Sequence, residues 1–197
     1  MNIADLIEKA RGADADALDE LLTTYRNYLR VTAQIWLPDQ LPARIDASDL
    51  VQETLLKAHE RFGQFRGRSE AELTVWLRKI LSRCLVDFVR HHQSAGRNVA
   101  REVPVQGELN SGDALGALVI ASATSPSAQA ERRELSVLLA DELAQMPEHY
   151  REVILLRSIK ERQWNEIAER MSREIGTVRA LWVRALNELR NRMNHYL

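Results

Sequence analysis

Hydrophobic and polar residues follow a helical pattern along most of this chain. Near the start, apolar side chains recur every three or four positions, which is the spacing of an amphipathic helix. The spacing continues through residues 14–37 and predicts one helix there, with Asp14 or Asp16 as its N-cap. The prolines of "PDQLPARI" end this run, because proline lacks the backbone N–H that a helix interior needs.

Two further helices are predicted before residue 93. The stretch "DASDLVQETLLKAHERF" begins at Asp46, an N-cap with Asp49 three residues later in the manner of a capping box. The glycines of "GQFRGR" then indicate a turn. Ser69 can cap a long helix that continues to His92. Antiparallel packing would bury the apolar stripes, so residues 1–92 are predicted to form one compact bundle.

The helical pattern is lost in residues 93–127. This segment is rich in Ser, Gly and Ala and shows no sustained period, which predicts a flexible linker. The pattern returns in residues 128–197, where four helices are predicted and Pro147 fits the first position of the second. The expected fold is therefore all-α, with two small helical domains on a flexible linker.

Composition narrows the class of protein. Hydrophobic residues make up 45% and charged residues 28%, as in ordinary globular proteins. The single cysteine, Cys84, cannot form an internal disulfide, which fits a reducing compartment. No apolar run approaches the roughly 18 residues of a membrane span, and the first residues do not resemble a signal peptide. We therefore expect a cytoplasmic protein with no membrane insertion.

Nothing in the sequence indicates catalysis. There is no glycine-rich phosphate loop and no nucleophile elbow. His91 and His92 are adjacent, so they point apart on a helix and make a poor metal pair. We expect no enzymatic activity, no cofactor and no metal.

The net charge of −1 conceals an uneven distribution. Residues 1–56 carry a net charge of −5, whereas residues 57–92 carry +4 and residues 167–197 carry +3. An acidic start followed by two basic blocks suggests different partners for different surfaces, with a polyanion possible at the basic ones.

The last predicted helix has two unlike sides. On a wheel of 100° per residue, one core stripe contains Val178, Trp182, Ala185 and Leu189. The opposite side carries small or neutral residues between two arginines: Gly176, Arg179, Ala180, Val183, Arg184 and Asn187. Such a face suits close approach to a major groove about 12 Å wide. The preceding "WNEIAERMSRE" gives the short helix and tight turn of a helix-turn-helix, although an ordinary amphipathic helix at the end of a bundle is the alternative.

Specific motifs in both blocks resemble the sigma-70 family. "EIAERM" followed by "IGTVRALWVRAL", with "MPEHYREVILLR" upstream, is similar to region 4 of that family. The "DLVQE" helix, the "FRG" turn and the tryptophan-containing helix are similar to region 2. Both regions in this order, with a linker and no region 3 between them, form the layout of the extracytoplasmic-function (ECF) sigma factors.

The resemblance implies a function for each part. It implies a sigma factor that binds the β′ clamp and β flap of core RNA polymerase, directs it to specific promoters and helps to melt the −10 region. The expected polymerase-binding residues are Asp49, Gln52 and Glu53, although for Asp49 alone a solvated helix cap is the alternative. Many family members are controlled by an anti-sigma factor, but no residue here identifies one.

The two basic blocks supply the expected DNA contacts. Beyond the core stripe of the long helix, Arg78, Lys79, Ser82, Arg83 and Arg90 are predicted to form one basic face. By resemblance, the −10 contacts are Phe65, Arg66, Arg68, Trp76, Arg78, Lys79, Ser82 and Arg83. Trp76 fits the core as well as the melting region. The expected −35 contacts are Arg173, Thr177, Arg179, Ala180, Val183 and Arg184.

The last helix departs from the family pattern. Ala180, Leu181 and Leu186 stand where the family often has a serine and two arginines, so we expect an unusual or weak −35 preference. Two other interpretations stay open. A stand-alone helix-turn-helix regulator would explain residues 147–192 but not "DLVQE", and a helical adaptor protein would use the amphipathic faces to bind other helices.

Overall fold

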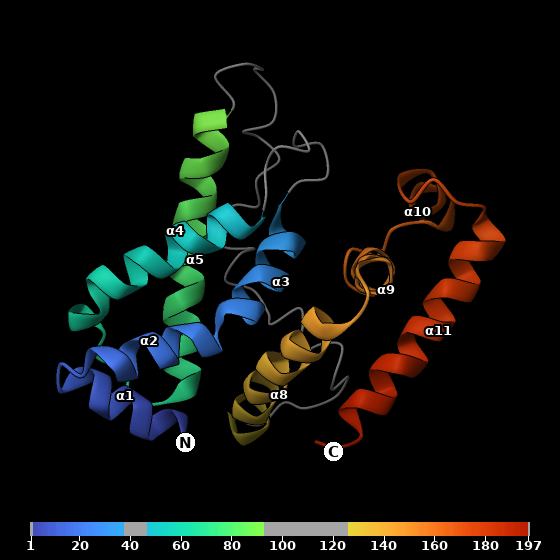
Figure 1. Cartoon of the computed structure of the whole chain (residues 1–197). Helices are drawn as coiled ribbons and strands as arrows, with labels where there is room; N and C mark the ends of the chain where they lie inside the picture. The colour runs from blue at the N-terminus through green and yellow to red at the C-terminus, as the bar shows by residue number, and fades with distance from the viewer. Residues whose placement is uncertain (1, 38–46, 93–125, 197) are drawn as a thin grey trace.

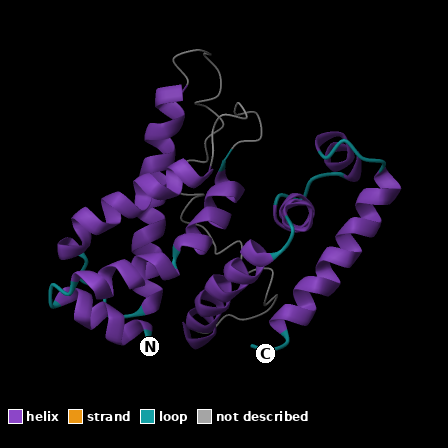
Figure 2. Cartoon of the chain, in the orientation of Figure 1, coloured by secondary structure: helices purple, strands orange, loops and turns teal. Residues whose placement is uncertain are grey.

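The computed structural model describes residues 2–37, 47–92 and 126–196 (Figure 1). Within these ranges the elements are all helices, joined by loops and turns, with no strand (Figure 2). None of the described helices is long and apolar enough to cross a membrane. The prediction of an all-α fold is confirmed.

The described residues of the N-terminal part, 2–37 and 47–92, form a bundle of five helices. They are α1 (Ile3–Arg11), α2 (Ala15–Thr24), α3 (Arg26–Trp36), α4 (Ala47–Arg61) and α5 (Glu70–His92). α1 packs on α2, while α4 lies against both α3 and α5. Large apolar side chains fill the centre, among them Tyr25, Tyr28, Leu50, Leu77 and Leu81.

The single helix predicted for residues 14–37 is two helices. Asp14 caps the first, because its side chain accepts a hydrogen bond from the Ala17 backbone N–H at 3.0 Å. The helix ends at Tyr25, which has φ −89° and ψ 0°. Tyr25 is fully buried beside Tyr28, with ring centroids 6.5 Å apart. No proline or glycine marks this break, so the sequence pattern did not reveal it.

The caps of the next two helices were also predicted. Asp46 lies outside the described residues. Ser69 does cap α5: its hydroxyl accepts from the Glu72 N–H at 3.3 Å, and Glu72 accepts from the Ser69 N–H at 3.1 Å. This reciprocal pair is a capping box, which fixes where the long helix begins.

The C-terminal part contains the four predicted helices. They are α8 (Pro126–Gln145), α9 (Glu148–Ile154), α10 (Trp164–Arg170) and α11 (Ile175–Met193). Pro147 is the N-cap of α9, one position before the predicted one. A π-helical turn, Leu155–Ile159, continues α9, where an ordinary helix had been expected.

Helix α8 connects the two parts of the molecule. It packs against α11, as expected, but also against α3 and α5 of the N-terminal bundle (Figure 1). Residues 93–125 lie outside the described ranges, so the flexible linker stays a prediction.

Candidate polymerase and nucleic-acid interfaces

The outer face of α4 carries the three residues predicted to bind polymerase. Asp49, Gln52 and Glu53 are all exposed. Glu53 pairs with Lys57, whose amine lies 3.0 Å from the Glu53 carboxylate. This hydrogen bond raises the pKa of Lys57.

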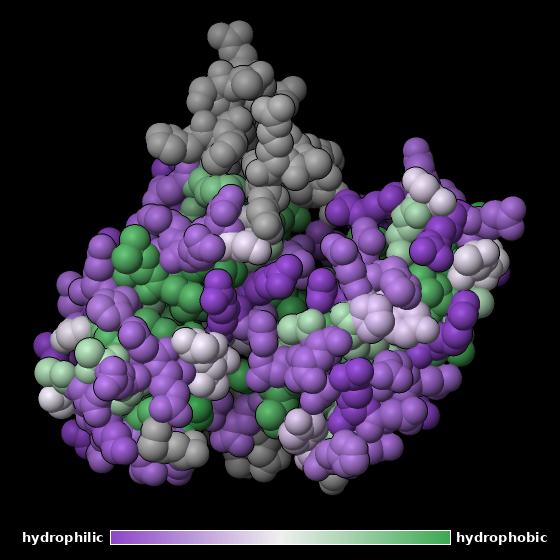
Figure 3. Space-filling view, viewed as in Figure 1, coloured by the Kyte–Doolittle hydropathy of each residue, from purple (hydrophilic) through white to green (hydrophobic). Residues whose placement is uncertain are grey.

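The sequence analysis missed an apolar residue on this face. Leu56 is 56% exposed and lies one helical turn after Gln52. Figure 3 shows hydrophobic residues gathered over α4 on an otherwise largely hydrophilic face. A helix wheel could have placed Leu56 beside Gln52 and Glu53. We call Asp49, Gln52, Glu53 and Leu56 the α4 face.

An aromatic cluster supports the turn before α5. The Phe65 ring lies 5.2 Å from that of Trp76 and 5.7 Å from that of Phe62, measured between centroids. Phe65 is only 4% exposed, so its predicted place at the surface was wrong. Trp76 is half-buried. The pair forms the wall of a shallow hollow of about 370 Å³, which Arg66 and Lys79 also line.

Two features hold this turn in shape. A Cβ atom on Gly67 would come within 2.5 Å of the Phe65 ring and 2.7 Å of the Glu72 Cβ, so no other residue fits without displacement. Glu72 accepts hydrogen bonds from the backbone N–H of Arg68 at 2.8 Å and from Ser69. The bond from Arg68, followed by those from Ser69, lowers the pKa of Glu72.

Helix α5 presents a narrower basic face than predicted. Lys79, Arg83 and Arg90 are exposed as expected. Ser82, however, is 5% exposed and packs in the core, so its placement on this face was wrong. Arg78 is half-buried on another side, with its guanidinium 5.5 Å from the Trp36 ring centroid.

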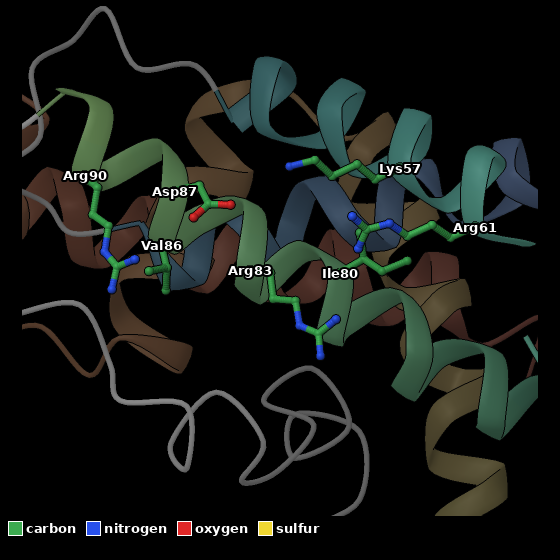
Figure 4. Close-up of a pocket in the computed structure, with 7 residues that line it drawn as sticks. All are labelled: Lys57, Arg61, Ile80, Arg83, Val86, Asp87 and Arg90. Atoms are coloured by element: carbon green, nitrogen blue, oxygen red, sulfur yellow. The ribbon is translucent and has the colours of Figure 1, made fainter. Parts of the chain in front are cut away.

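A groove of about 520 Å³ lies between α4 and α5 (Figure 4). Lys57 and Arg61 line it from α4, whereas Arg83, Asp87 and Arg90 line it from α5. Because Lys79 and Arg83 are one turn apart, this groove continues the hollow beside Trp76 along one side of α5. Positive charge thus follows the helix for several turns.

The helix-turn-helix has a tight central turn. Ser172 adopts a positive φ of 51°, and the Arg173 N–H donates to the Ala168 carbonyl at 2.9 Å. The turn places α10 across α11 (Figure 1). Val178, Ala185 and Leu189 are buried as predicted.

The buried side of α11 differs from the predicted stripe at two positions. Leu181 is 3% exposed, whereas Trp182 is only half-buried. The Trp182 indole N–H donates to the Ser158 hydroxyl at 3.1 Å. Helix α11 packs against α8, α9 and α10, so its buried stripe is wider than that of a helix that packs against one neighbour.

The outer face of α11 is open. All six predicted −35 residues are exposed, namely Arg173, Thr177, Arg179, Ala180, Val183 and Arg184. Val183 is 50% exposed, and Ile175, which the sequence analysis did not single out, is 43% exposed. We call these seven residues the α11 face.

The arginines of this face are partly held in place. Arg179 lies 5.6 Å from the Trp164 ring centroid, and Arg157 lies 4.7 Å from the same centroid. Arg184 donates to the carbonyl of Ala180 at 3.3 Å. Cation–π contacts of this kind keep a guanidinium oriented while leaving its N–H groups available to an anion.

The described residues contain no cluster of three or more His, Cys, Asp or Glu side chains that could hold a metal. Cys84 is buried, and this burial raises the pKa of its thiol. A buried thiol with a raised pKa is a poor nucleophile.

Comparison with known proteins identifies the family. Residues 21–95 match Sigma-70 region 2, and residues 136–189 match Sigma-70, region 4. The ECF RNA polymerase sigma-E factor of Haemophilus influenzae is 26% identical over 189 residues, covering 95% of this chain and 93% of that protein. The chain belongs to the ECF group of the sigma-70 family. Its predicted function as an ECF-type sigma factor in transcription initiation is confirmed.

The chain is also similar to a second curated sigma factor and to one solved structure. The RNA polymerase sigma-H factor of Pseudomonas aeruginosa is 26% identical over 184 residues, covering 91% of this sigma factor and 88% of that one. A solved structure, "Structure of CnrH in complex with the cytosolic domain of CnrY", covers 98% of this chain and 97% of that chain at 19% identity, with a TM-score of 0.34. ECF sigma factors work with core RNA polymerase and promoter DNA.

Proposed function

We propose that this sigma factor assigns three tasks to three separate surfaces. The α4 face binds core polymerase, the basic side of α5 binds the −10 element, and the α11 face reads the −35 element. The observation that carries the proposal is the match to regions 2 and 4 on one chain whose expected functional faces are exposed.

The α4 face has the make-up of a protein-binding surface. Leu56 supplies an exposed apolar group, and the hydrogen-bonding groups of Gln52 and Glu53 lie one turn before it, with Asp49 one turn further. An apolar centre with a polar rim is typical of interfaces in which a few residues supply most of the affinity. Its partner is the coiled coil of the polymerase β′ clamp, while the C-terminal domain meets the β flap.

The hollow beside Trp76 suits an unstacked base. Stacking on an aromatic side chain stabilises a base in any single strand, and adjacent positive charge attracts the phosphate backbone. Trp76 supplies the ring, while Arg66, Arg68, Lys79 and Arg83 supply the charge. Phe65 supports the Trp76 ring as part of the wall of this hollow, whereas Ser82 packs in the core.

The α11 face suits the major groove of a −35 element. Ala180 and Val183 allow close approach and offer apolar contact to thymine methyl groups. The exposed arginines at its edges reach phosphates or guanine edges. Because few donors point from the centre of this face, its sequence preference differs from that of relatives with a serine and more arginines there.

The proposed assembly works in the cytoplasm, on a single polymerase. Two DNA contacts that are weak on their own bind more tightly when one polymerase holds both, because the second contact then forms at a high effective concentration. The free protein lacks this scaffold and therefore binds promoters weakly. A protein of the anti-sigma class would inhibit it by covering the α4 face or the α11 face.

Run-off transcription tests the proposal. Purified bacterial core polymerase and a library of promoter fragments are incubated with and without this protein. We expect protein-dependent transcripts from promoters that share one −35 and −10 pair. If transcripts are absent, capture of core polymerase by the wild type and by a Gln52→Ala, Glu53→Ala variant decides the matter. Binding that the variant loses would leave the assignment standing, whereas no binding by either protein would overturn it.

A further inference from the structure

The carboxylate that caps helix α5 uses only one of its two oxygens for the cap. Oε2 of Glu72 accepts hydrogen bonds from the backbone N–H of Arg68 at 2.8 Å, the backbone N–H of Ser69 at 3.1 Å and the Ser69 hydroxyl at 2.9 Å. Among the described residues, none donates a hydrogen bond to the other oxygen, Oε1. The turn therefore holds the Glu72 side chain in place and leaves one acceptor available to a ligand.

Glu72 lines the same hollow as the Trp76 ring. These two residues are four positions apart on α5, and Lys79 follows three positions later, so all three lie along one side of the helix. A base that stacks on Trp76 therefore has a carboxylate one helical turn to one side and an ammonium group one turn to the other. The hollow offers one hydrogen-bond acceptor and one donor beside its stacking surface.

The Glu72 carboxyl group is held in its charged form. The hydrogen bond from Arg68, with those from Ser69, lowers the pKa of Glu72, and the positive charge of Arg11 acts in the same direction. Arg11 also donates to the carbonyl of Arg66 at 3.3 Å, which ties α1 to the turn. A carboxylate alone would repel the phosphates of a DNA strand, but the arginines of the turn and of α1 offset that repulsion.

A charged carboxylate distinguishes thymine from the other three bases. An ionised carboxylate oxygen accepts hydrogen bonds and cannot donate one. Adenine, cytosine and guanine each carry an exocyclic amino group that can donate, whereas thymine carries carbonyl oxygens and a methyl group instead. The single ring N–H of thymine lies between two carbonyl oxygens, so a thymine beside Glu72 would bring a second acceptor close to Oε1. Two acceptors repel each other, and the hydrogen bond is lost.

We propose that Glu72 determines which base is held beside Trp76: it favours a base with an exocyclic amino group and disfavours thymine. This inference rests on the proposed function, in which the hollow holds an unstacked base of the −10 element. It adds the class of base and the atom that reads it, Oε1 of Glu72. One hydrogen bond between a charged group and a base edge gives a preference of about tenfold.

A thymine scan of the −10 strand tests the inference. Oligonucleotides with the non-template −10 strand of a promoter selected by run-off transcription receive thymine at one position at a time, and their affinity for the holoenzyme is measured. At one position thymine should lower the affinity of the wild type about tenfold. Glu72→Gln keeps an oxygen for the N–H groups of Arg68 and Ser69 but presents an amide N–H₂ in place of Oε1, so at that position it should bind thymine at least as well as the original base. The same preferences in both proteins, or an equal loss of affinity for every oligonucleotide in Glu72→Gln, would overturn the inference.

Two further variants separate this inference from the proposed function. Asp87→Asn removes an exposed negative charge from α5 outside the hollow, so it should change the affinity for every oligonucleotide by the same factor. Trp76→Ala should still capture core polymerase but bind the original strand about tenfold more weakly, because a stacking surface is lost. If Trp76→Ala binds as tightly as the wild type, the hollow holds no base, and both its proposed role and the inference fail. If Trp76→Ala weakens binding but Glu72→Gln leaves the base preference unchanged, the hollow holds a base that Glu72 does not read, and only the inference fails.

Discussion

The N-terminal bundle and the C-terminal domain differ in how they bury their side chains. The bundle buries two aromatic rings almost completely, those of Tyr25 at 0% and Tyr28 at 1% exposed. In the C-terminal domain the fully buried side chains are aliphatic, such as Leu143, Ile154 and Val178, and the tryptophans are only half-buried. The two cores thus differ in where their aromatic rings lie: inside the bundle, but at the edge of the C-terminal core.

Core truncation should show this difference most strongly. Leu81→Ala should lower the free energy of unfolding by about 2–5 kcal/mol, because it leaves a cavity in the bundle. Val178→Ala should cost about 1–3 kcal/mol, since fewer carbon atoms are lost. Urea unfolding followed by circular dichroism measures both. A larger loss for Val178→Ala would contradict the expectation that the loss grows with the number of buried carbon atoms removed.

Substitutions on the α4 face should affect binding and not folding. Leu56→Ala, Gln52→Ala and Glu53→Ala together should weaken the binding of core polymerase by about 100-fold or more, because they remove an interface centre and its hydrogen bonds. Surface plasmon resonance with immobilised core polymerase measures the effect. Glu8→Ala, an exposed carboxylate on α1, is the matched control and should bind like the wild type. Equal binding by the triple variant would move the docking site elsewhere.

Glycine substitutions separate melting from docking. Gly67→Ala places a Cβ against the Phe65 ring, so it should distort the turn and reduce promoter opening by about tenfold without loss of core binding. Permanganate reactivity of −10 thymines measures opening. Gly63→Ala is the control, because nothing lies within 4 Å of its added Cβ. If the two variants open promoters equally well, the turn has no part in melting.

Loss of one arginine on α11 should have a smaller effect. The affinity of the holoenzyme for a −35 duplex falls as salt rises. Arg179→Ala should make this fall less steep, reducing the magnitude of the slope of log affinity against log salt by about one, as expected for one lost phosphate contact. Arg190→Ala is a fair control on the same helix, exposed but far from the turn. An unchanged slope for Arg179→Ala, or an equal change for Arg190→Ala, would argue against the proposed α11 face.

Much of the fold could be predicted from the sequence because helical spacing and caps are local signals. Asp14 and Ser69 cap helices through neighbours three residues away, and the sequence contains all that such a cap needs. The break at Tyr25 could not be predicted, since it serves tertiary burial of that ring and carries no proline or glycine. The burial of Leu181 on α11 likewise reflects three packing partners that a wheel does not contain.

The candidate surfaces were predicted less completely than the helices. The family motif predicted Asp49, Gln52 and Glu53 as surface residues. Leu56 belongs to no motif, and only its exposure in the structure adds it to the α4 face. Phe65 and Ser82 were placed outside because their burial depends on Trp76 and on the packing of α5. The contact of Asn27 with Asp141 joins two polar residues 114 positions apart, for which no periodic pattern exists.

The measurement that most directly tests the central claim compares two variants in one transcription assay. Core polymerase is supplied with the wild type, with Gln52→Ala, Glu53→Ala, or with Arg179→Ala, Arg184→Ala, and both core binding and run-off transcript are measured. We predict that both variants lose transcript but that only the first loses core binding. Full transcription by both variants, or loss of core binding by the arginine variant alone, would contradict the division of tasks between the α4 face and the α11 face.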